Sequence, residues 1–109
     1  MKMKMGIVIN TNDPETVWNA FRFVVTSLLK QQEVKVFLLG RGVEIEQIKD
    51  EQFNVTKLTD RFLHAGGHIL ACGTCLKMRN IEGLAICPTS SMADLLKIVQ
   101  ESDKVLTFS

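Results

Sequence analysis

The sequence has no excess of charge of either sign. Thirteen basic side chains stand against twelve acidic ones, and the formal net charge is +1 over 109 residues. A protein built around phosphate contacts needs a basic surface that releases counterions from nucleic acid. The balance of charge therefore argues against nucleic acid, and we expect no nucleic-acid partner.

The chain also lacks a long apolar run. No stretch approaches the roughly 20 residues needed to span a bilayer. The apolar stretch after the basic opening ends at Asn10, which is too short for an export signal. No internal repeat or low-complexity linker divides the chain, and 109 residues leave no room for a second core. We expect one domain over residues 1–109, no membrane partner and a cytoplasmic location.

Short apolar runs alternate with segments of helical periodicity, in a composition that is 46% apolar and typical of a globular protein. Predicted strands cover residues 5–10, 34–39, 68–72, 84–87 and 104–108. Predicted helices cover residues 14–31, 55–65, 75–79 and 92–102, and residues 43–53 show no clear pattern. Strands joined through helices need crossover connections. The pattern therefore predicts an α/β fold, with a mainly parallel sheet that carries helices on both faces.

The cysteines lie where such a fold places its chemistry. In an open parallel sheet the site lies outside the carboxyl ends of the strands. This rule selects residues 10–13, 40–42, 72–75 and 87–91.

Cys72 and Cys75 straddle a predicted strand-to-helix junction, and Lys77 and Arg79 add positive charge nearby in the sequence. A thiol beside a helix amino terminus meets unpaired amide hydrogens and the positive end of the helix dipole, which stabilise the thiolate. We therefore predict Cys72 to be the most reactive thiol. Cys75, inside the first turn, is expected to react more slowly or to act as the resolving thiol.

The three cysteines also suit roles other than that of a nucleophile, and these alternatives stay open. In a reducing compartment cysteines are free, metal-bound or catalytic more often than disulfide-bonded, and each can also pack as a small apolar residue. A zinc site would need Cys87 and His68 to complete its four ligands. The Cys-x-x-Cys spacing also suits a redox disulfide. Cys87 itself is best explained as a small residue that ends a buried strand. We assign no metal and no cofactor.

Three segments of the chain resemble a known family. Residues 72–80 read Cys-Gly-Thr-Cys-Leu-Lys-Met-Arg-Asn, residues 15–23 read Glu-Thr-Val-Trp-Asn-Ala-Phe-Arg-Phe, and residues 103–108 read Asp-Lys-Val-Leu-Thr-Phe. Through them the chain resembles the DsrE/DsrF-like family from about residue 5 to residue 108. The resemblance implies a three-layer α/β/α fold around a five-stranded parallel sheet. It also implies a homo-oligomer, either a trimer or a hexamer.

The resemblance extends to function. In the sulfur-relay members of the family a cysteine before a short helix carries persulfide sulfur, and matching that cysteine to this chain gives Cys72. Cys75 has no counterpart in those subunits, so its role as a resolving thiol is not implied by the resemblance. The expected function is that of a sulfurtransferase-like carrier with sulfur donor and acceptor proteins as partners. A non-catalytic oligomeric module that binds a ligand or partner, and a dithiol redox protein, are the alternatives.

Overall fold

Strands and helices alternate through residues 2–109, the part of the chain that the computed structural model describes. The strands are β1 (Lys4–Ile9), β2 (Glu33–Leu38), β3 (His68–Cys72), β4 (Thr89–Ser90) and β5 (Lys104–Phe108). The helices are α1 (Pro14–Leu29), the 3-10 helix η1 (Gly40–Gln47), α2 (Val55–His64), α3 (Gly73–Met78) and α4 (Met92–Glu101). None of the helices described in residues 2–109 combines the length and apolar character needed to cross a membrane.

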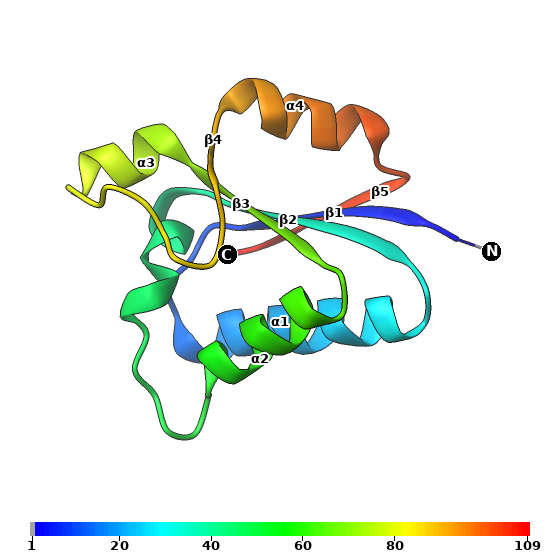
Figure 1. Ribbon diagram of the computed structural model, residues 1–109, viewed down its shortest axis with the longest axis horizontal. Helices are drawn as coiled ribbons and strands as arrows, with labels where there is room; N and C mark the ends of the chain where they lie inside the picture. Colours follow the sequence, from blue (N-terminus) through cyan, green and yellow to red (C-terminus); the bar gives the residue numbers. More distant parts are fainter. Residues whose placement is uncertain (1) are drawn as a thin grey trace.

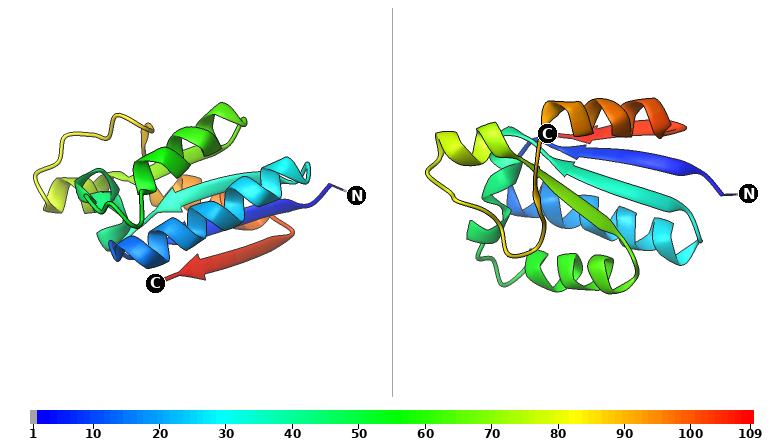
Figure 2. Two further views of the ribbon diagram at one scale, coloured as in Figure 1. Left: turned by 90° about the horizontal axis from the view of Figure 1, so that it is seen from below. Right: turned by 45° about the horizontal axis from the view of Figure 1, so that its top comes forward.

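The strands form one parallel sheet in the order β4-β3-β2-β1-β5. Helices α1 and α2 cover one face of this sheet, and α3 and α4 lie on the other side (Figure 1, Figure 2). The predicted three-layer α/β/α fold with a five-stranded parallel sheet is therefore confirmed. Because the strands are parallel, their carboxyl ends and the loops that follow them lie along one edge of the sheet.

Helix α1 begins at a local signal in the sequence. The Asp13 carboxylate accepts hydrogen bonds from the Thr16 backbone N–H at 2.9 Å and from the Thr16 hydroxyl at 2.8 Å. Pro14 occupies the first turn, where no N–H is needed. The apolar face of the helix is buried, and the Phe21 ring meets Phe62 of α2 edge-on with ring centroids 5.7 Å apart. This contact joins the two helices of that layer.

The predicted strand at residues 84–87 is wrong. These residues form a tight turn closed by an antiparallel bridge between Leu84 and Cys87. The fourth strand is the two-residue β4, which begins after Pro88 and pairs with β3. Cys87 therefore lies in the turn that precedes β4 and does not end a strand.

Hydrogen bonding explains this difference. The Ile86 backbone N–H donates to the Glu46 carboxylate at 3.1 Å, so a side chain of η1 satisfies it in place of a neighbouring strand. The Pro88 carbonyl accepts the Ala71 N–H at 3.3 Å, so pairing with β3 starts at a residue that has no N–H of its own. A run of four apolar residues is also too short for its periodicity to distinguish a strand from a turn.

Helix η1 packs against the carboxyl end of the sheet and includes part of the segment whose sequence shows no clear pattern. Gly42 lies so close to β1 that a Cβ there would collide with the Ile9 carbonyl oxygen. Gly40 adopts a φ of +54°, in the left-handed region, beside the Asn10 side chain. The two glycines allow η1 to contact the sheet edge at which the sequence predicts the site.

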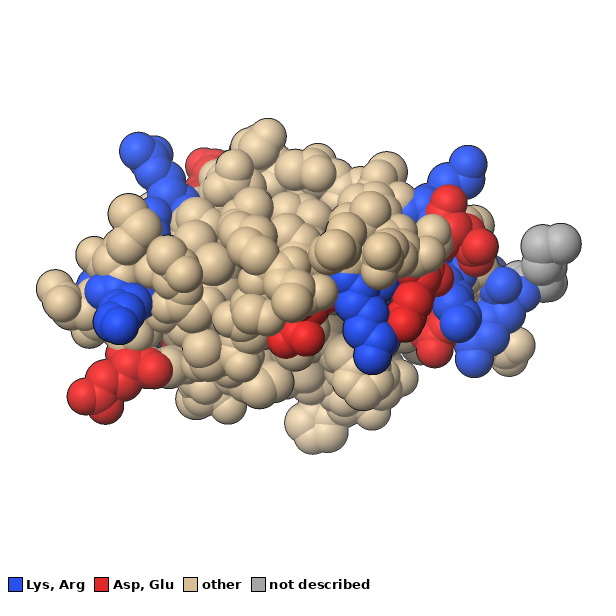
Figure 3. All heavy atoms as spheres, turned by 90° about the horizontal axis from the view of Figure 1, so that it is seen from above, with Lys and Arg blue, Asp and Glu red and all other residues tan. Residues whose placement is uncertain are grey.

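Helix α4 and strand β5 leave apolar side chains exposed. Met92 is 57% exposed and Leu96 is 56% exposed, and Val99, Val105 and Leu106 are also exposed. Figure 3 looks down on this side of the molecule, where charged side chains gather toward the two ends and the middle is largely uncharged. This surface is apolar enough to suit contact with another protein surface.

Candidate functional site

Cys72 and Cys75 lie together where β3 ends and α3 begins. Cys72 is the last residue of β3 and the N-cap of α3, because its Sγ accepts the Cys75 backbone N–H at 3.4 Å. Both thiols are free. Cys72 is 1% exposed, so the surrounding chain covers its sulfur. The structure thus places the two predicted site residues side by side and buries the one that was expected to react first.

Cys75 is partly exposed, and its sulfur has a backbone donor. The Gly40 N–H donates to Cys75 Sγ at 3.2 Å. Burial raises the pKa of the Cys75 thiol, and its hydrogen bond with Cys72 also raises it, against the opposing effects of the Gly40 N–H and the Arg79 charge. Burial dominates because it removes hydration from the thiolate. Cys75 is therefore protonated at neutral pH, with a donor already in place for the thiolate.

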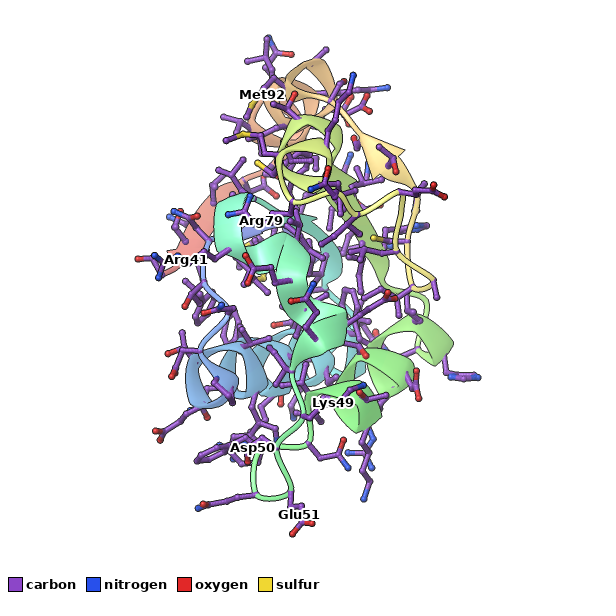
Figure 4. The ribbon with its side chains drawn as sticks, turned by 90° about the vertical axis from the view of Figure 1, so that its left-hand side faces the viewer. Arg41, Lys49, Asp50, Glu51, Arg79 and Met92 are labelled. Atoms are coloured by element: carbon purple, nitrogen blue, oxygen red, sulfur yellow. The ribbon has the colours of Figure 1, made fainter. Side chains whose placement is uncertain are left out.

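An ion pair joins the end of α3 to η1 beside Cys75. Arg79 Nε donates to the Glu44 carboxylate at 2.6 Å, and Arg79 Nη1 donates to the Cys75 carbonyl at 3.0 Å. The other Glu44 oxygen accepts a hydrogen bond from Asn12 Nδ2 at 3.0 Å. Arg79 and then Asn12 hold the pKa of the Glu44 carboxyl below its usual value, so this side chain is ionised at neutral pH. Figure 4 views this end of the molecule, with Arg79 beside η1.

Three of the four loops predicted to form the site are in contact. Asn12 follows β1, Gly40 and Glu44 follow β2, and Cys75 follows β3, and the hydrogen bonds above connect them. In the fourth loop, Ser90 pairs with Cys72 across the β3–β4 ladder. The carboxyl ends of neighbouring parallel strands therefore do converge on the cysteine pair, as the sequence predicts.

Cys87 is held differently from the other two thiols. Burial, followed by repulsion from the Glu46 carboxylate, raises the pKa of its thiol to about 11. The same carboxylate accepts the N–H of the adjacent Ile86. At neutral pH the Cys87 thiolate is scarce, and Glu46 disfavours it further, whereas the Gly40 N–H and the Arg79 charge favour the thiolate at Cys75.

The two sides of α3 have different surroundings. A groove of about 420 Å³ runs along one side and is lined by residues that include Gly73, Leu76, Lys77 and Thr89. Cys75 and Arg79 are four residues apart and lie on the other side, toward η1. Of the two cations expected near the thiols, Arg79 therefore reaches the site, and Lys77 faces the groove.

Residues 2–109 contain no group of three or more His, Cys, Asp or Glu side chains arranged to hold a metal ion. His68 and Cys72 are at opposite ends of β3, roughly 13 Å apart at about 3.3 Å per residue. The zinc alternative therefore has no set of ligands in this part of the chain.

Sequence reasoning missed two features of the site. The Gly40 N–H is a backbone donor, and only a turn was expected there, since a backbone group leaves no trace in the residue type. Glu44 falls within residues 43–53, where no pattern was found, and its partner Arg79 is 35 residues further along the chain. The pairing of an acidic with a basic residue was the only available signal, and such pairs are abundant in a chain that is 23% charged.

The sequence matches one protein family and two proteins over most of its length. The model of the DsrE/DsrF-like family matches residues 3–108. "Uncharacterized protein MJ0989" from Methanocaldococcus jannaschii is 36% identical over an alignment of 118 positions. The alignment covers 97% of this chain and 100% of that protein. "Uncharacterized protein MK0008" from Methanopyrus kandleri is 36% identical over 103 residues, which cover 86% of this chain and 83% of that protein.

Solved structures share the fold at lower identity. The crystal structure of the ychN protein from E. coli superposes with a TM-score of 0.84 at 20% identity, over 99% of this chain and 100% of that one. The protein BT1422 from Bacteroides thetaiotaomicron superposes with a TM-score of 0.78 at 21% identity, over 96% of this chain and 94% of that one. The chain therefore shares its fold with proteins from these two bacteria.

Proposed function

Since the chain belongs to the DsrE/DsrF-like family, we propose that it is a sulfur carrier that accepts sulfane sulfur as a cysteine persulfide and passes it to an acceptor. The proposed site is the pair Cys72 and Cys75. The chemistry requires thiols that remain reduced between turnovers, which suits the cytoplasmic location expected from the sequence.

The observation that carries the proposal is the surroundings of the two sulfurs. Cys72 Sγ accepts the Cys75 N–H, and Cys75 Sγ accepts the Gly40 N–H. Hydrogen bonds to sulfur favour the thiolate, which is the form that attacks a sulfane sulfur. Cysteines that served only to fill space would gain little from N–H groups directed at their sulfurs.

The reaction needs no cofactor. A cysteine thiolate attacks the outer sulfur of a donor persulfide, a new S–S bond forms on the protein, and the donor thiolate leaves with the electron pair of the broken bond. Transfer onward is the same exchange in reverse, with an acceptor thiolate attacking the outer sulfur. Each step conserves sulfur and charge, so the carrier requires a donor and an acceptor as partners.

Intact-mass spectrometry tests the proposal. The reduced protein is mixed with glutathione persulfide and quenched within seconds with iodoacetamide. We expect a gain of about 32 Da, one sulfur atom, beyond the mass of the alkylated protein. The double variant Cys72→Ser, Cys75→Ser retains Cys87 as an internal control and is expected to gain no sulfur. A wild-type protein that takes up no sulfur would contradict the proposal and favour the non-catalytic binding module.

The thiol contact also supports a dithiol redox protein as a second candidate. Two free thiols this close together can form a disulfide when an oxidant is present. A redox protein would cycle between dithiol and disulfide without gaining sulfur from glutathione persulfide. The same mass measurement therefore separates the two functions.

We also propose that the carrier is a homo-oligomer, a trimer or a hexamer, assembled through the exposed surface of α4 and β5. The support is the apolar surface that Met92, Leu96 and Val105 leave in contact with water. Strand β5 is an edge of the sheet, so one side of its backbone is also free to pair. A second copy of the chain would bury this surface and satisfy that edge.

A further inference from the structure

The two thiols of the site differ in access. Cys72 is 1% exposed, whereas Cys75 is partly exposed. Thiol exchange requires the attacking sulfur to approach in line with the S–S bond that breaks, so a soluble donor needs an open path to that sulfur. Cys75 offers such a path, and Cys72 is covered by the chain around it.

Cys75 also has a fixed donor for developing negative charge. The Gly40 N–H lies 3.2 Å from Cys75 Sγ. Gly40 is held in place by its left-handed backbone and its packing against Asn10. Arg79 binds the Cys75 carbonyl at 3.0 Å and places a positive charge nearby. An attacking Cys75 thiolate would therefore be stabilised by groups that need not move.

Cys72 is positioned to act on Cys75. Its sulfur accepts the Cys75 N–H at 3.4 Å, which places the two thiols close together at the start of α3. A buried thiol that soluble donors cannot reach can still attack a neighbouring sulfur. The pair thus combines an exposed thiol with a covered one behind it.

We propose that sulfur is loaded onto Cys75 and that Cys72 then displaces it as hydrosulfide. This order rests on the proposed function and is the reverse of the order expected from the sequence. The Cys75 thiolate first takes the outer sulfur of a donor persulfide, and the donor thiolate leaves. The Cys72 thiolate then attacks Cys75 Sγ, a Cys72–Cys75 disulfide forms, and the bond to the outer sulfur breaks.

The second step balances without an added reagent. The outer sulfur leaves as HS⁻ with the electron pair of the broken S–S bond, so it is reduced while the two cysteine sulfurs are oxidised to the disulfide. A dithiol reductant, by thiol exchange, returns the pair to its starting state. The carrier would in this way deliver sulfide, and one Cys72–Cys75 disulfide would form for each sulfide released.

The order is tested with three single variants. Wild type, Cys72→Ser, Cys75→Ser and the control Cys87→Ser are each loaded with glutathione persulfide, desalted, and followed by intact mass and by an assay for released sulfide. Serine at position 72 keeps an N-cap for α3, because its hydroxyl can accept the Cys75 N–H. Circular dichroism of each variant checks that the fold is kept.

Each variant has a distinct expected result. Wild type and Cys87→Ser release about one sulfide per chain and end about 2 Da lighter than the reduced protein, as a disulfide requires. Cys72→Ser keeps the added 32 Da, about one sulfur atom, and releases at least about tenfold less sulfide. Cys75→Ser loads at least about tenfold less sulfur than wild type.

The experiment distinguishes an error in the proposed order of the two cysteines from an error in the proposed sulfur-carrier function. If Cys75→Ser loads normally on Cys72, or if Cys72→Ser still releases sulfide at the wild-type rate, the order is overturned and the sulfur carrier stands. If neither the wild type quenched within seconds nor Cys72→Ser gains sulfur, the proposed function fails, even where sulfide is released. Should Cys72→Ser not fold, peptide mapping of wild type quenched within seconds with iodoacetamide decides the order, since an added sulfur found on Cys72 and not on Cys75 would overturn it.

Discussion

Each of the three cysteines meets different surroundings. Cys72 is covered and caps a helix, Cys75 is partly exposed beside a backbone donor, and Cys87 is partly buried beside the Glu46 carboxylate. Burial is the first cause of the raised pKa at both Cys75 and Cys87. At the scale of single residues, access to solvent and nearby charge therefore differentiate thiols that look alike in the sequence.

Alkylation across a pH range tests this difference between thiols. Below its pKa a cysteine is mostly in the protonated thiol form. The thiolate fraction, and with it the labelling rate, therefore rises about tenfold per pH unit until the pKa is reached. With its pKa at about 11, Cys87 at pH 9 holds only about one part in a hundred as thiolate. We expect limiting iodoacetamide, followed by peptide mapping from pH 7 to 10, to label Cys75 well ahead of Cys87 throughout.

A conservative change at Glu46 serves as the control. Glu46→Gln can still accept the Ile86 N–H but removes the negative charge that adds to the pKa of Cys87. Labelling of Cys87 is expected to increase a few-fold at most, because burial is the larger cause, and labelling of Cys75 should not change. Faster labelling of Cys87 than of Cys75 in the wild type would show that these surroundings are misassigned.

Among the elements, η1 organises the site. Gly40 at its start donates to Cys75, Glu44 in its middle binds Arg79, and Glu46 near its end binds Ile86. One short helix thus contacts the thiol pair, the end of α3 and the turn before β4. Its own position depends on the close approach of Gly42 to β1.

A side chain at Gly42 is expected to displace η1. In Gly42→Ala the new Cβ would collide with the Ile9 carbonyl oxygen, which belongs to a buried strand and cannot easily move. Such overpacking costs about 1–3 kcal/mol of unfolding free energy, and the Gly40–Cys75 contact should loosen with it. Urea denaturation measures the loss of stability, and sulfur loading measures the effect on the site.

Gly83→Ala is the matched control for that substitution. Its Cβ would meet Thr89 Oγ1 at 3.8 Å, an ordinary contact, and Gly83 lies in the loop after α3. We expect a change within about 0.5 kcal/mol. Equal stability of the two variants would mean that η1 can shift to accommodate the added methyl group. The close approach of Gly42 to β1 would then not be what holds η1 in position.

The elements differ in how well the sequence predicts them. Helix α1 was predicted because Asp13 and Pro14 mark its start and its apolar residues recur at helical spacing. The fourth strand was predicted in the wrong place. Two residues are too few to show the alternation of a strand, and the nearby apolar run at residues 84–87 had the composition of one. At the site, the sequence predicted both cysteines and their edge of the sheet. It did not predict the Gly40 donor or the Glu44–Arg79 pair, which exist only after residues far apart in the chain are brought together.

At the scale of the whole molecule, apolar surface gathers on both sides of β5. On one side, Leu96 and Val99 of α4 are exposed, as is Val105 of β5. On the other side, the exposed Phe23 ring lies 6.4 Å from the Phe108 ring. A monomer would leave this surface and the free edge of the sheet in water, which favours association.

The mass in solution and one charge substitution test the proposed assembly. Light scattering is expected to give at least three times the 12.2 kDa of one chain. Leu96→Glu should lower this mass, because an unpaired carboxylate buried in an interface costs several kcal/mol. Leu29→Glu is the matched control, since Leu29 is 71% exposed on α1, on the opposite side of the sheet, and should leave the mass unchanged. A wild-type mass of one chain, or equal dissociation by both variants, would contradict assembly through α4 and β5.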